Sequence, residues 1–583
     1  MTIDPVTLAV IKGGLEEVTE EMDSTLVRTA FSPAMCESRD RADGIYRADI
    51  GSLVVQGKTG MPAFIATMQF TVQSLIEILK TREVSPGDIF MANDPYLGGT
   101  HLMDIKFIKP FFYKGELLCF LANAGHWSDM GGSVPGGFAA QATEIYQEGI
   151  QIPPVKLFTK GKLNKDVEDI LLRNIRVPRE RQGDLRANIN ALFVGDERLT
   201  KLLERYGRDT VMDCIIELED RSERMMRSRI EEISDGFYNY TDYMDSDGVV
   251  NKQLEIHLEI EVKGSDMLLD FSKSSPPCRG PLNSVLATTK AGIYIGIMHL
   301  FPDLYINGGM LKPFKFNVPT TTFLNATYPA PVSGCAAEVM SRVTDCLFGA
   351  LHKAIPDIVS AAQHSSANNL TIGGYDPKKG HYIMYLFSGG GYGGHKKGDG
   401  LAYGNSSAST SRTTSIEVYE QRAPILYRRF TLREGSGGPG KNRGGLSGIV
   451  EFELLRGYGY LSFLGDRGKM GPFGIFGGKP GAKARYSWFK RGKRYFPPHV
   501  TKAEKILLEE GDRVLVETPG GGGYGNPFER DPEAVLMDVK GGYITTKSAK
   551  EDYGVMIEKR SNGLRINYEE TNKIRKQNKT RKN

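Results

Sequence analysis

The 583-residue sequence is poor in cysteine and in long apolar runs, and each shortage argues against a class of protein. Its six cysteines form no CxxC pair and lie mostly within apolar or helical patterns, which indicates a reducing compartment. No stretch of about 18 consecutive apolar residues is present, and the N-terminal stretch carries acids where a signal peptide needs a basic region. We therefore expect a cytoplasmic protein that has no membrane anchor of its own.

An excess of either charge is also missing. The 74 Lys and Arg residues against 70 Asp and Glu residues leave a formal charge of +4, which indicates neither a nucleic acid nor a membrane as a partner. Hydrophobic residues make up 40% of the chain and charged residues 25%, as in ordinary globular proteins, whereas glycine is abundant at 68 residues. The length predicts several structural units.

The hydrophobic period changes along the chain. Spacings of three and four predict helices over residues 5–30, 62–83, 160–235 with a break at Val177 and Pro178, 283–299 and 336–354. Residues 254–271 alternate in polarity and predict two strands around a turn. Beyond residue 360 the chain is rich in glycine and in strand-like segments, and it ends in a basic, polar stretch that we expect to be a frayed tail.

One hairpin brings histidines and an aspartate together. DIKFIKPFFY and GELLCFLANAG read as antiparallel strands around Lys114 and Gly115, so that residue 104 pairs with residue 125 and residue 103 with 126. Asp104 and His126 then meet at the open end of the hairpin. His101 lies three residues before Asp104, on a glycine-loosened turn, and folds back toward the same point.

Two imidazoles and a carboxylate suit a divalent ion. They bind zinc, manganese or ferrous iron, and three protein ligands with open positions are typical of a catalytic site. Polar residues at wet strand ends are the alternative explanation, and we favour the metal because such clusters mark metal or catalytic sites. The predicted fold class is mixed α/β (α+β): a helical, metal-bearing N-terminal region over residues 1–235, a glycine-rich mixed region over 236–528 and an extension over 529–583.

Other motifs are weak. Residues 435–442, GSGGPGKN, lack the final Ser or Thr of a phosphate-binding loop and precede no predicted helix; residues 389–394 and 520–525 satisfy GxGxxG outside a strand–helix–strand unit. Cys335 before a helix and Cys36 in a turn are candidate nucleophiles, but we expect both to be buried small residues. The sequence therefore predicts no nucleotide site of its own.

Six blocks follow one another along the chain: NDPYLGGTHLMDI, GHWSDMGG, ATEIYQEGIQIPP, NIRVPRERQGDLRANI, REGSGGPGKNRGG and ETPGGGGYGNP. In this order they resemble the hydantoinase B and 5-oxoprolinase family over residues 3–528. The resemblance implies a metal bound by His101, Asp104 and His126, with a fourth, acidic ligand at Asp40. Asp43 is the alternative, because RDRADGIY departs from the common family pattern there.

The resemblance also implies a division of labour. A hydantoinase A type ATPase subunit, which holds ATP and magnesium, phosphorylates the substrate, and the present chain completes the hydrolysis of a cyclic amide. The alternative within the same superfamily is a subunit of an ATP-dependent ketone carboxylase of the acetone or acetophenone carboxylase type. Either reading predicts a hetero-oligomer.

The remaining acids give further candidates. Asp129 follows His126 by three residues and is the candidate for orienting that histidine or transferring a proton. Glu144 and Glu148 are spaced to share a helical face, although surface solvation explains them nearly as well. The glycine-rich residues 388–400 and 435–446 approach either an intermediate or the partner, or form tight turns between strands.

Overall fold

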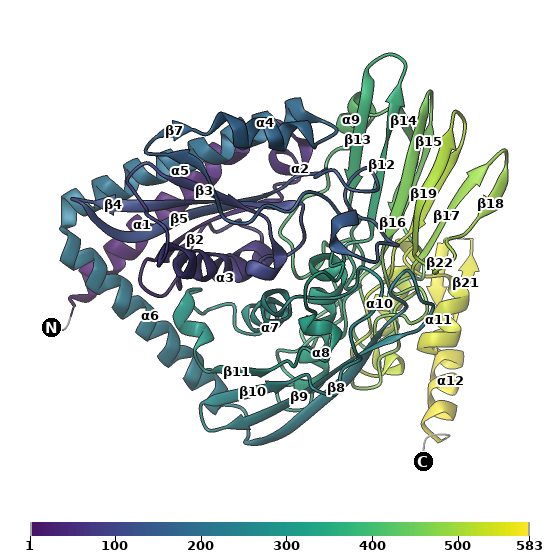
Figure 1. The fold of residues 1–583 in the computed structure, drawn as a ribbon. Helices are drawn as coiled ribbons and strands as arrows, with labels where there is room; N and C mark the ends of the chain where they lie inside the picture. Colours follow the sequence, from purple (N-terminus) through teal and green to yellow (C-terminus); the bar gives the residue numbers. More distant parts are fainter. Residues whose placement is uncertain (1–2, 562, 581–583) are drawn as a thin grey trace.

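A mixed α/β architecture is found in the computed structural model, which describes residues 3–561 and 563–580 (Figure 1). The N-terminal part contains a seven-stranded sheet in the order β2-β1-β5-β4-β3-β6-β7. Its strands are β1 (Arg41–Arg47), β2 (Leu53–Gln56), β3 (Ile89–Ala92), β4 (Asp104–Tyr113), β5 (Glu116–His126), β6 (Val155–Thr159) and β7 (Lys162–Leu163). The long central pair, β4 and β5, is the predicted hairpin.

The register of this hairpin differs by one residue from the prediction. Tyr113 pairs with Glu116 and Phe112 with Leu117, as a turn at Lys114 and Gly115 requires, but a bulge at Phe111 and Phe112 then shifts the ladder. Asp104 therefore lies directly opposite His126. A bulge adds one residue to one strand, and the local sequence did not indicate it.

Helices cover both faces of the seven-stranded sheet (Figure 1). The helices of this part are α1 (Pro5–Thr29), α2 (Pro33–Cys36), α3 (Pro62–Leu79), α4 (Lys165–Arg173), α5 (Pro178–Tyr206) and α6 (Arg208–Glu231). The paired helices α1 and α5 pack on one face and α3 on the other. α1 begins as predicted, because the Asp4 carboxylate accepts a 2.9 Å hydrogen bond from the Thr7 amide and Pro5 opens the first turn.

The α3 helix is the one described helix that is long and apolar enough to cross a membrane by length and composition alone. Of its residues, 56% are buried inside the protein. The core helix of a globular protein has the same length and composition, so α3 is weak evidence for a membrane span.

A second sheet lies beyond α3, with two helices between the sheets (Figure 1). Its order is β11-β10-β9-β8, and its elements are β8 (Gly236–Met244), β9 (Leu254–Lys263), β10 (Asp266–Asp270) and β11 (Phe314–Asn317), with α7 (Leu286–Leu300) and α8 (Met340–Leu351). A π-helical turn, Cys335–Val339, precedes α8. One hydrophobic core runs from α1 through both sheets to α8 and so crosses residue 235; the proposed division there stays a prediction.

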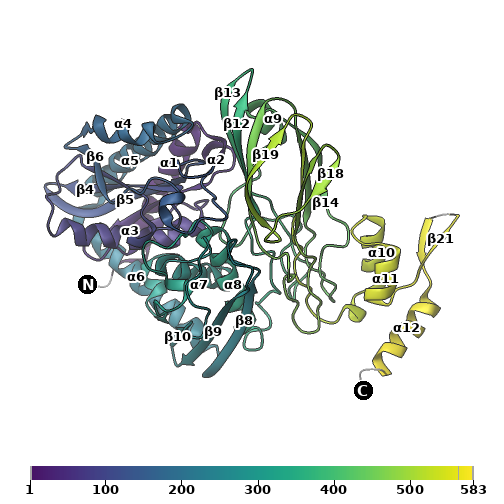
Figure 2. The same ribbon diagram turned by 45° about the vertical axis from the view of Figure 1, so that its right-hand side comes forward.

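Two antiparallel sheets form the C-terminal half and enclose a second core (Figure 2). The first, β13-β12-β16-β19, consists of β12 (Asn369–Asp376), β13 (Gly380–Leu386), β16 (Tyr458–Leu464) and β19 (Lys502–Glu509). The second, β14-β15-β20-β17-β18, consists of β14 (Ile425–Leu432), β15 (Gly448–Leu454), β17 (Arg485–Lys490), β18 (Lys493–Tyr495) and β20 (Arg513–Glu517), and α9 (Ile416–Arg422) precedes it.

The glycine-rich segments pack against one another beside these sheets. The amide of Gly391 donates to Pro519, that of Gly438 to Gly521, and that of Gly521 to Gly445, over 2.8–3.1 Å. A Cβ on Gly521 would lie 1.8 Å from the carbonyl oxygen of Tyr392. Main chain therefore approaches main chain with no room for side chains.

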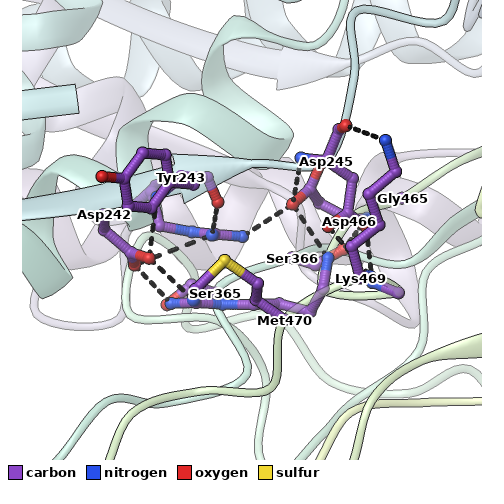
Figure 3. A network of polar contacts seen from close by, with 12 residues as sticks. Asp242, Tyr243, Asp245, Ser365, Ser366, Gly465, Asp466, Lys469 and Met470 are labelled. Atoms are coloured by element: carbon purple, nitrogen blue, oxygen red, sulfur yellow. Dashed lines mark hydrogen bonds and ion pairs between the residues drawn. The ribbon is translucent and has the colours of Figure 1, made fainter. Parts of the chain in front are cut away.

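A buried ionic network joins the two halves (Figure 3). Asp466, after β16, accepts hydrogen bonds from Arg342 of α8 at 2.9 Å and from Lys502 of β19 at 2.8 Å. Arg467 donates to Asp345 at 2.7 Å and lies 2.9 Å from Asp242 of β8. Burial alone would raise the pKa of Asp466, but Lys502 and Arg342 lower it to about 2. These ion pairs connect β8 and α8 of the first half to the end of β16 and the start of β19 in the second.

The last part of the chain has a small core of its own and stands to one side (Figure 2). It contains α10 (Pro532–Lys540), α11 (Thr546–Tyr553), the hairpin β21 (Ile557–Arg560) and β22 (Gly563–Ile566), and α12 (Tyr568–Thr580). The expectation of a frayed tail was wrong for α12, which is helical and is anchored where Arg575 donates to the carbonyl of Arg530 at 2.8 Å. Residues 581–583 lie outside the described residues.

Candidate metal centre

Three of the predicted ligands converge at the open end of the β4–β5 hairpin. Asp104 and His126 face each other across the two strands, with 3.0 Å between the Asp104 Oδ1 and His126 Nδ1 atoms. His101 lies on the preceding turn, and its Nδ1 is 3.1 Å from Asp104 Oδ2. The ligand atoms of the three residues all lie within 4.8 Å of one another, and all three side chains are buried.

The sequence left two candidates for the fourth ligand, Asp40 and Asp43, and they occupy different positions relative to the other three. Asp40 directly precedes β1, is 2% exposed, and lines one cavity together with the other three ligands. Asp43 lies further along β1 opposite Asn123, where Asp23 is its neighbour. Asp40 therefore shares the cavity of the three predicted ligands, and Asp43 does not line it.

Burial sets the charge of these groups. It lowers the pKa of His101 to about 4 against the pull of Asp104, so this imidazole is neutral at pH 7 and offers a lone pair. For Asp104, burial acts to raise the pKa, but His101 and His126 hold it below its ordinary value. Burial raises the pKa of Asp40 to about 7, with Asp104 adding to the rise and His126 opposing it.

Unpartnered polar atoms mark the same place. Asp40 Oδ1 and His126 Nε2 are buried and have no hydrogen-bond partner among the described residues. An unpaired buried carboxylate oxygen is costly unless something absent from the chain satisfies it. Two imidazoles and two carboxylates are ligands that zinc, manganese and ferrous iron accept, so the residues present fit a divalent transition metal.

Several residues that support the ligands escaped the sequence analysis. The Thr100 hydroxyl donates a short hydrogen bond to Asp104. The Tyr385 ring packs 4.6 Å from the His126 ring, and the Phe138 ring stacks on both. Thr100 directly precedes His101, so its role as a hydrogen-bond donor to a ligand could have been predicted from the sequence. Tyr385 is far from the ligands in the sequence, and no local pattern indicates its contact with His126.

The cavity over the ligands measures about 40 Å³. Its other walls are largely apolar and include Met61, Phe64 and Phe387, while Asn405, Ser406 and Ser409 contribute polar atoms. A water molecule needs about 10–15 Å³ measured in this way, so the cavity has room for an ion with a few waters.

The other candidate acids lie elsewhere. Asp129 is fully buried and accepts hydrogen bonds from the amides of Gly131, Gly136 and Arg176, and from the Arg176 guanidinium at 2.8 Å. Among the described residues it makes no hydrogen bond to His126, so its role at the site stays a prediction. It orders the loop that leads to Phe138.

The two glutamates do not share a face. Glu144 is exposed, whereas Glu148 is fully buried and accepts the amides of Val332 and Ser333 at 3.0 and 2.8 Å. The intervening turn is a short 3-10 helix, Ile145–Gln147, rather than a regular α-helical turn.

The cysteine and nucleotide motifs supply no reactive group. Burial raises the pKa of both Cys335 and Cys36, so neither thiol is held as a thiolate. The segment 435–442 leads into strand β15, and its Gly438 amide already donates to Gly521. No helix N-terminus follows it to hold a phosphate.

Comparison with known proteins defines the class to which this fold and site belong. The family model described as hydantoinase B/oxoprolinase matches residues 4–527. The chain belongs to the hydantoinase B/oxoprolinase family, and it is an enzyme of the hydantoinase B and 5-oxoprolinase type.

Two curated relatives span almost the whole chain. The B-type component of a putative D-/L-hydantoinase from a Pseudomonas species is 33% identical over 98% of this chain and 98% of its own. The beta chain of the caprolactamase from Pseudomonas jessenii is also 33% identical, over 96% of this chain and 97% of its own.

Two solved structures share the fold. The ATP-dependent caprolactamase from Pseudomonas jessenii superposes with a TM-score of 0.90 at 31% identity, over 99% of this chain and all of that chain. A nucleotide-free acetone carboxylase superposes with a TM-score of 0.94, over 99% of this chain and 83% of that chain. At 21% identity, the second likeness concerns the fold alone.

Proposed function

We propose that this chain is the metal-containing subunit of an ATP-dependent cyclic-amide hydrolase of the hydantoinase or oxoprolinase type. In this proposal a hydantoinase A type ATPase partner activates the substrate, and the two subunits form a cytoplasmic hetero-oligomer. The observation that carries it is the buried cluster of His101, Asp104 and His126 beside Asp40, in a chain of a family whose members include lactam and hydantoin hydrolases.

A divalent ion held there would act as a Lewis acid and lower the pKa of a bound water. The residues of the chain provide the setting for that chemistry. His101 is kept neutral by burial, and hydrogen bonds with His126 and Thr100 help to hold the pKa of Asp104 below its ordinary value. Thr100, Phe138 and Tyr385 restrict the orientation of these ligands, and the apolar wall formed by Met61, Phe64 and Phe387 limits access of bulk water.

Hydrolysis is favoured over the alternative, ketone carboxylation, by sequence identity. The caprolactamase structure is 31% identical to this chain and the acetone carboxylase structure 21%, although both superpose closely. Fold similarity alone does not separate the two chemistries, since one fold hosts several reactions.

A coupled ATPase assay with the co-expressed partner separates these reactions. The substrates are 5-oxoproline, N-methylhydantoin, caprolactam, acetone and acetophenone, each with and without bicarbonate. We expect ATP-dependent ring opening of one cyclic amide that does not require bicarbonate. Turnover of a ketone only when bicarbonate is present would replace the hydrolase proposal with the carboxylase one.

Metal content is tested separately, by elemental analysis of protein purified without chelators. We expect about one equivalent of zinc, manganese or iron per chain. Less than about a tenth of an equivalent, with no gain on adding metal back, would remove the metal from the proposal.

A further inference from the structure

Asp184 lies in α5, within the block NIRVPRERQGDLRANI, and its fully buried side chain does not line the cavity. Its Oδ1 accepts hydrogen bonds from the backbone amides of Phe31 and Ser32, both at 2.9 Å. Its Oδ2 lies 3.2 Å from the guanidinium of Arg181, one helical turn earlier. A helix of the outer layer thus holds the backbone just before α2.

The two amides begin a short, internally bonded segment, residues 31–40, which we call the Asp40 arm. Within it the amide of Ser38 donates to the carbonyl of Pro33 at 2.8 Å, and the amide of Asp40 donates to Ala34 at 2.9 Å. These bonds fold the arm into compact turns around α2. Because the arm has these internal hydrogen bonds, a displacement at residues 31 and 32 should also displace Asp40.

Two close contacts press the arm against its surroundings. A Cβ on Gly183 would lie 2.3 Å from Phe31 Cγ, so only glycine lets the start of the arm sit this close to α5. A Cβ on Gly125 would lie 2.7 Å from Met35 Cε, so the middle of the arm packs directly on strand β5. At its end, the carbonyl of Asp40 accepts the amide of His126 at 3.0 Å.

Asp184 is the one buried charge bonded to the first amides of the arm, among the described residues. A carboxylate that accepts two backbone amides is a charge-assisted anchor, and removing it takes the acceptor from both amides, of which that of Ser32 is buried. No residue of the block lines the cavity, so this anchor is the block's connection to the candidate site.

We propose that Asp184 is a positioning residue for the fourth ligand: by fixing the start of the Asp40 arm, it sets the position of the Asp40 carboxylate relative to His101, Asp104 and His126. This inference rests on the proposed metal centre. It assigns the block around Asp184 to the assembly of that centre and not to substrate contact.

The test is a double-mutant cycle on the full chain, stripped of metal and titrated with Co²⁺, with visible absorption and calorimetry as readouts. Asp184→Ala should weaken Co²⁺ affinity about tenfold, as the loss of a group that orients a ligand does. It should also alter the Co²⁺ absorption bands toward those of Asp40→Ala. Asp184→Asn should keep near-normal affinity, since its amide oxygen still accepts both backbone amides. In an Asp40→Ala background, Asp184→Ala should cost no further affinity.

A matched control comes from the same helix. Asp196 of α5 pairs with Lys109 of β4 at 3.2 Å and touches no part of the arm, so Asp196→Ala should leave Co²⁺ affinity unchanged. Gly183→Ala provides a second route to the same displacement, through Phe31, if Asp184→Ala does not fold. It should weaken Co²⁺ severalfold.

The outcomes are distinct. The proposal would be overturned if Asp184→Ala lowered Co²⁺ affinity equally in the wild-type chain and in the Asp40→Ala variant. The effect of Asp184 would then not depend on Asp40. Unchanged Co²⁺ affinity in folded Asp184→Ala and Gly183→Ala would also overturn it. Absence of Co²⁺ binding by the wild-type chain would instead refute the metal centre, and this inference with it.

Discussion

The backbone amide of His126 donates a 3.0 Å hydrogen bond to the carbonyl oxygen of Asp40. This bond continues the ladder in which Arg41 pairs with Gly125. Strand β5 ends at the predicted ligand His126, and strand β1 begins directly after the predicted ligand Asp40. The pairing of β1 with β5 is therefore what places the acidic fourth position beside the histidines.

The first prediction concerns the ligands. His126→Ala should remove the metal and lower kcat/KM at least about a hundredfold, because several kcal/mol of charge stabilisation are lost. Metal analysis and the coupled assay measure both effects. His257→Ala is the control. This half-buried histidine of β9 shares a hydrogen bond with Thr241, and both residues are far from the candidate ligands in the sequence. Full activity of the His126 variant would refute the metal centre.

The second prediction concerns Asp129. Asp129→Asn keeps the shape of the side chain but loses the charge that holds Arg176, so the loop before Phe138 should loosen while the ligands stay. We expect normal metal content and a lower kcat. Arg176→Gln should lower kcat in the same way. Retention of full activity by both variants would dismiss a role for this pair.

The third prediction uses pH. Burial raises the pKa of Glu148 to about 8, although the amides of Val332 and Ser333 act to lower it. The folded protein therefore holds a proton that the unfolded chain releases near its ordinary value of 4.5. The contribution of this group to the free energy of unfolding is complete below that value and is lost as pH rises through about 8.

Glu148→Gln should remove this dependence. Relative to wild type, its free energy of unfolding should rise by on the order of 1 kcal/mol per pH unit between about pH 5 and 8. Denaturant unfolding of the metal-free proteins at several pH values measures the difference. Parallel pH profiles for the two proteins would show that Glu148 does not hold this proton.

The fourth prediction concerns the glycine-rich segments. Gly521→Ala would place a Cβ 1.8 Å from the Tyr392 carbonyl oxygen, and we expect it to lower the free energy of unfolding by at least about 3 kcal/mol or to prevent folding. Gly13→Ala is the control, because nothing lies within 4 Å of that position in α1. Alanine there should stabilise the helix by up to about 1 kcal/mol.

The fifth prediction is dependence on a partner. The chain expressed alone should hydrolyse no ATP and turn over no cyclic amide, because its one P-loop-like segment leads into a strand and uses its amides internally. Co-expression with a hydantoinase A type subunit should give a stable complex with both activities. ATP-dependent turnover by the isolated chain would contradict the division of labour.

The sequence by itself determined the local elements and three of the candidate ligands. Helices α1 and α3 follow from the spacing of apolar residues, and the β4–β5 hairpin follows from two apolar runs around Lys114 and Gly115. His101, Asp104 and His126 all lie at one end of that hairpin. Their convergence depends on one turn, which is readable from local chemistry, whereas the bulge that puts Asp104 directly opposite His126 is not.

Only the tertiary structure showed that Asp40, and not Asp43, lines the cavity of the other candidate ligands. Only it brought Tyr385 against His126, and Asp184 against the start of the Asp40 arm. These residues come from separate strands and helices, and their approach depends on strand pairing, buried hydrogen bonds and missing Cβ atoms at Gly125 and Gly183. Local propensity carries no information about such contacts, because their free energy is gained only when distant segments have packed.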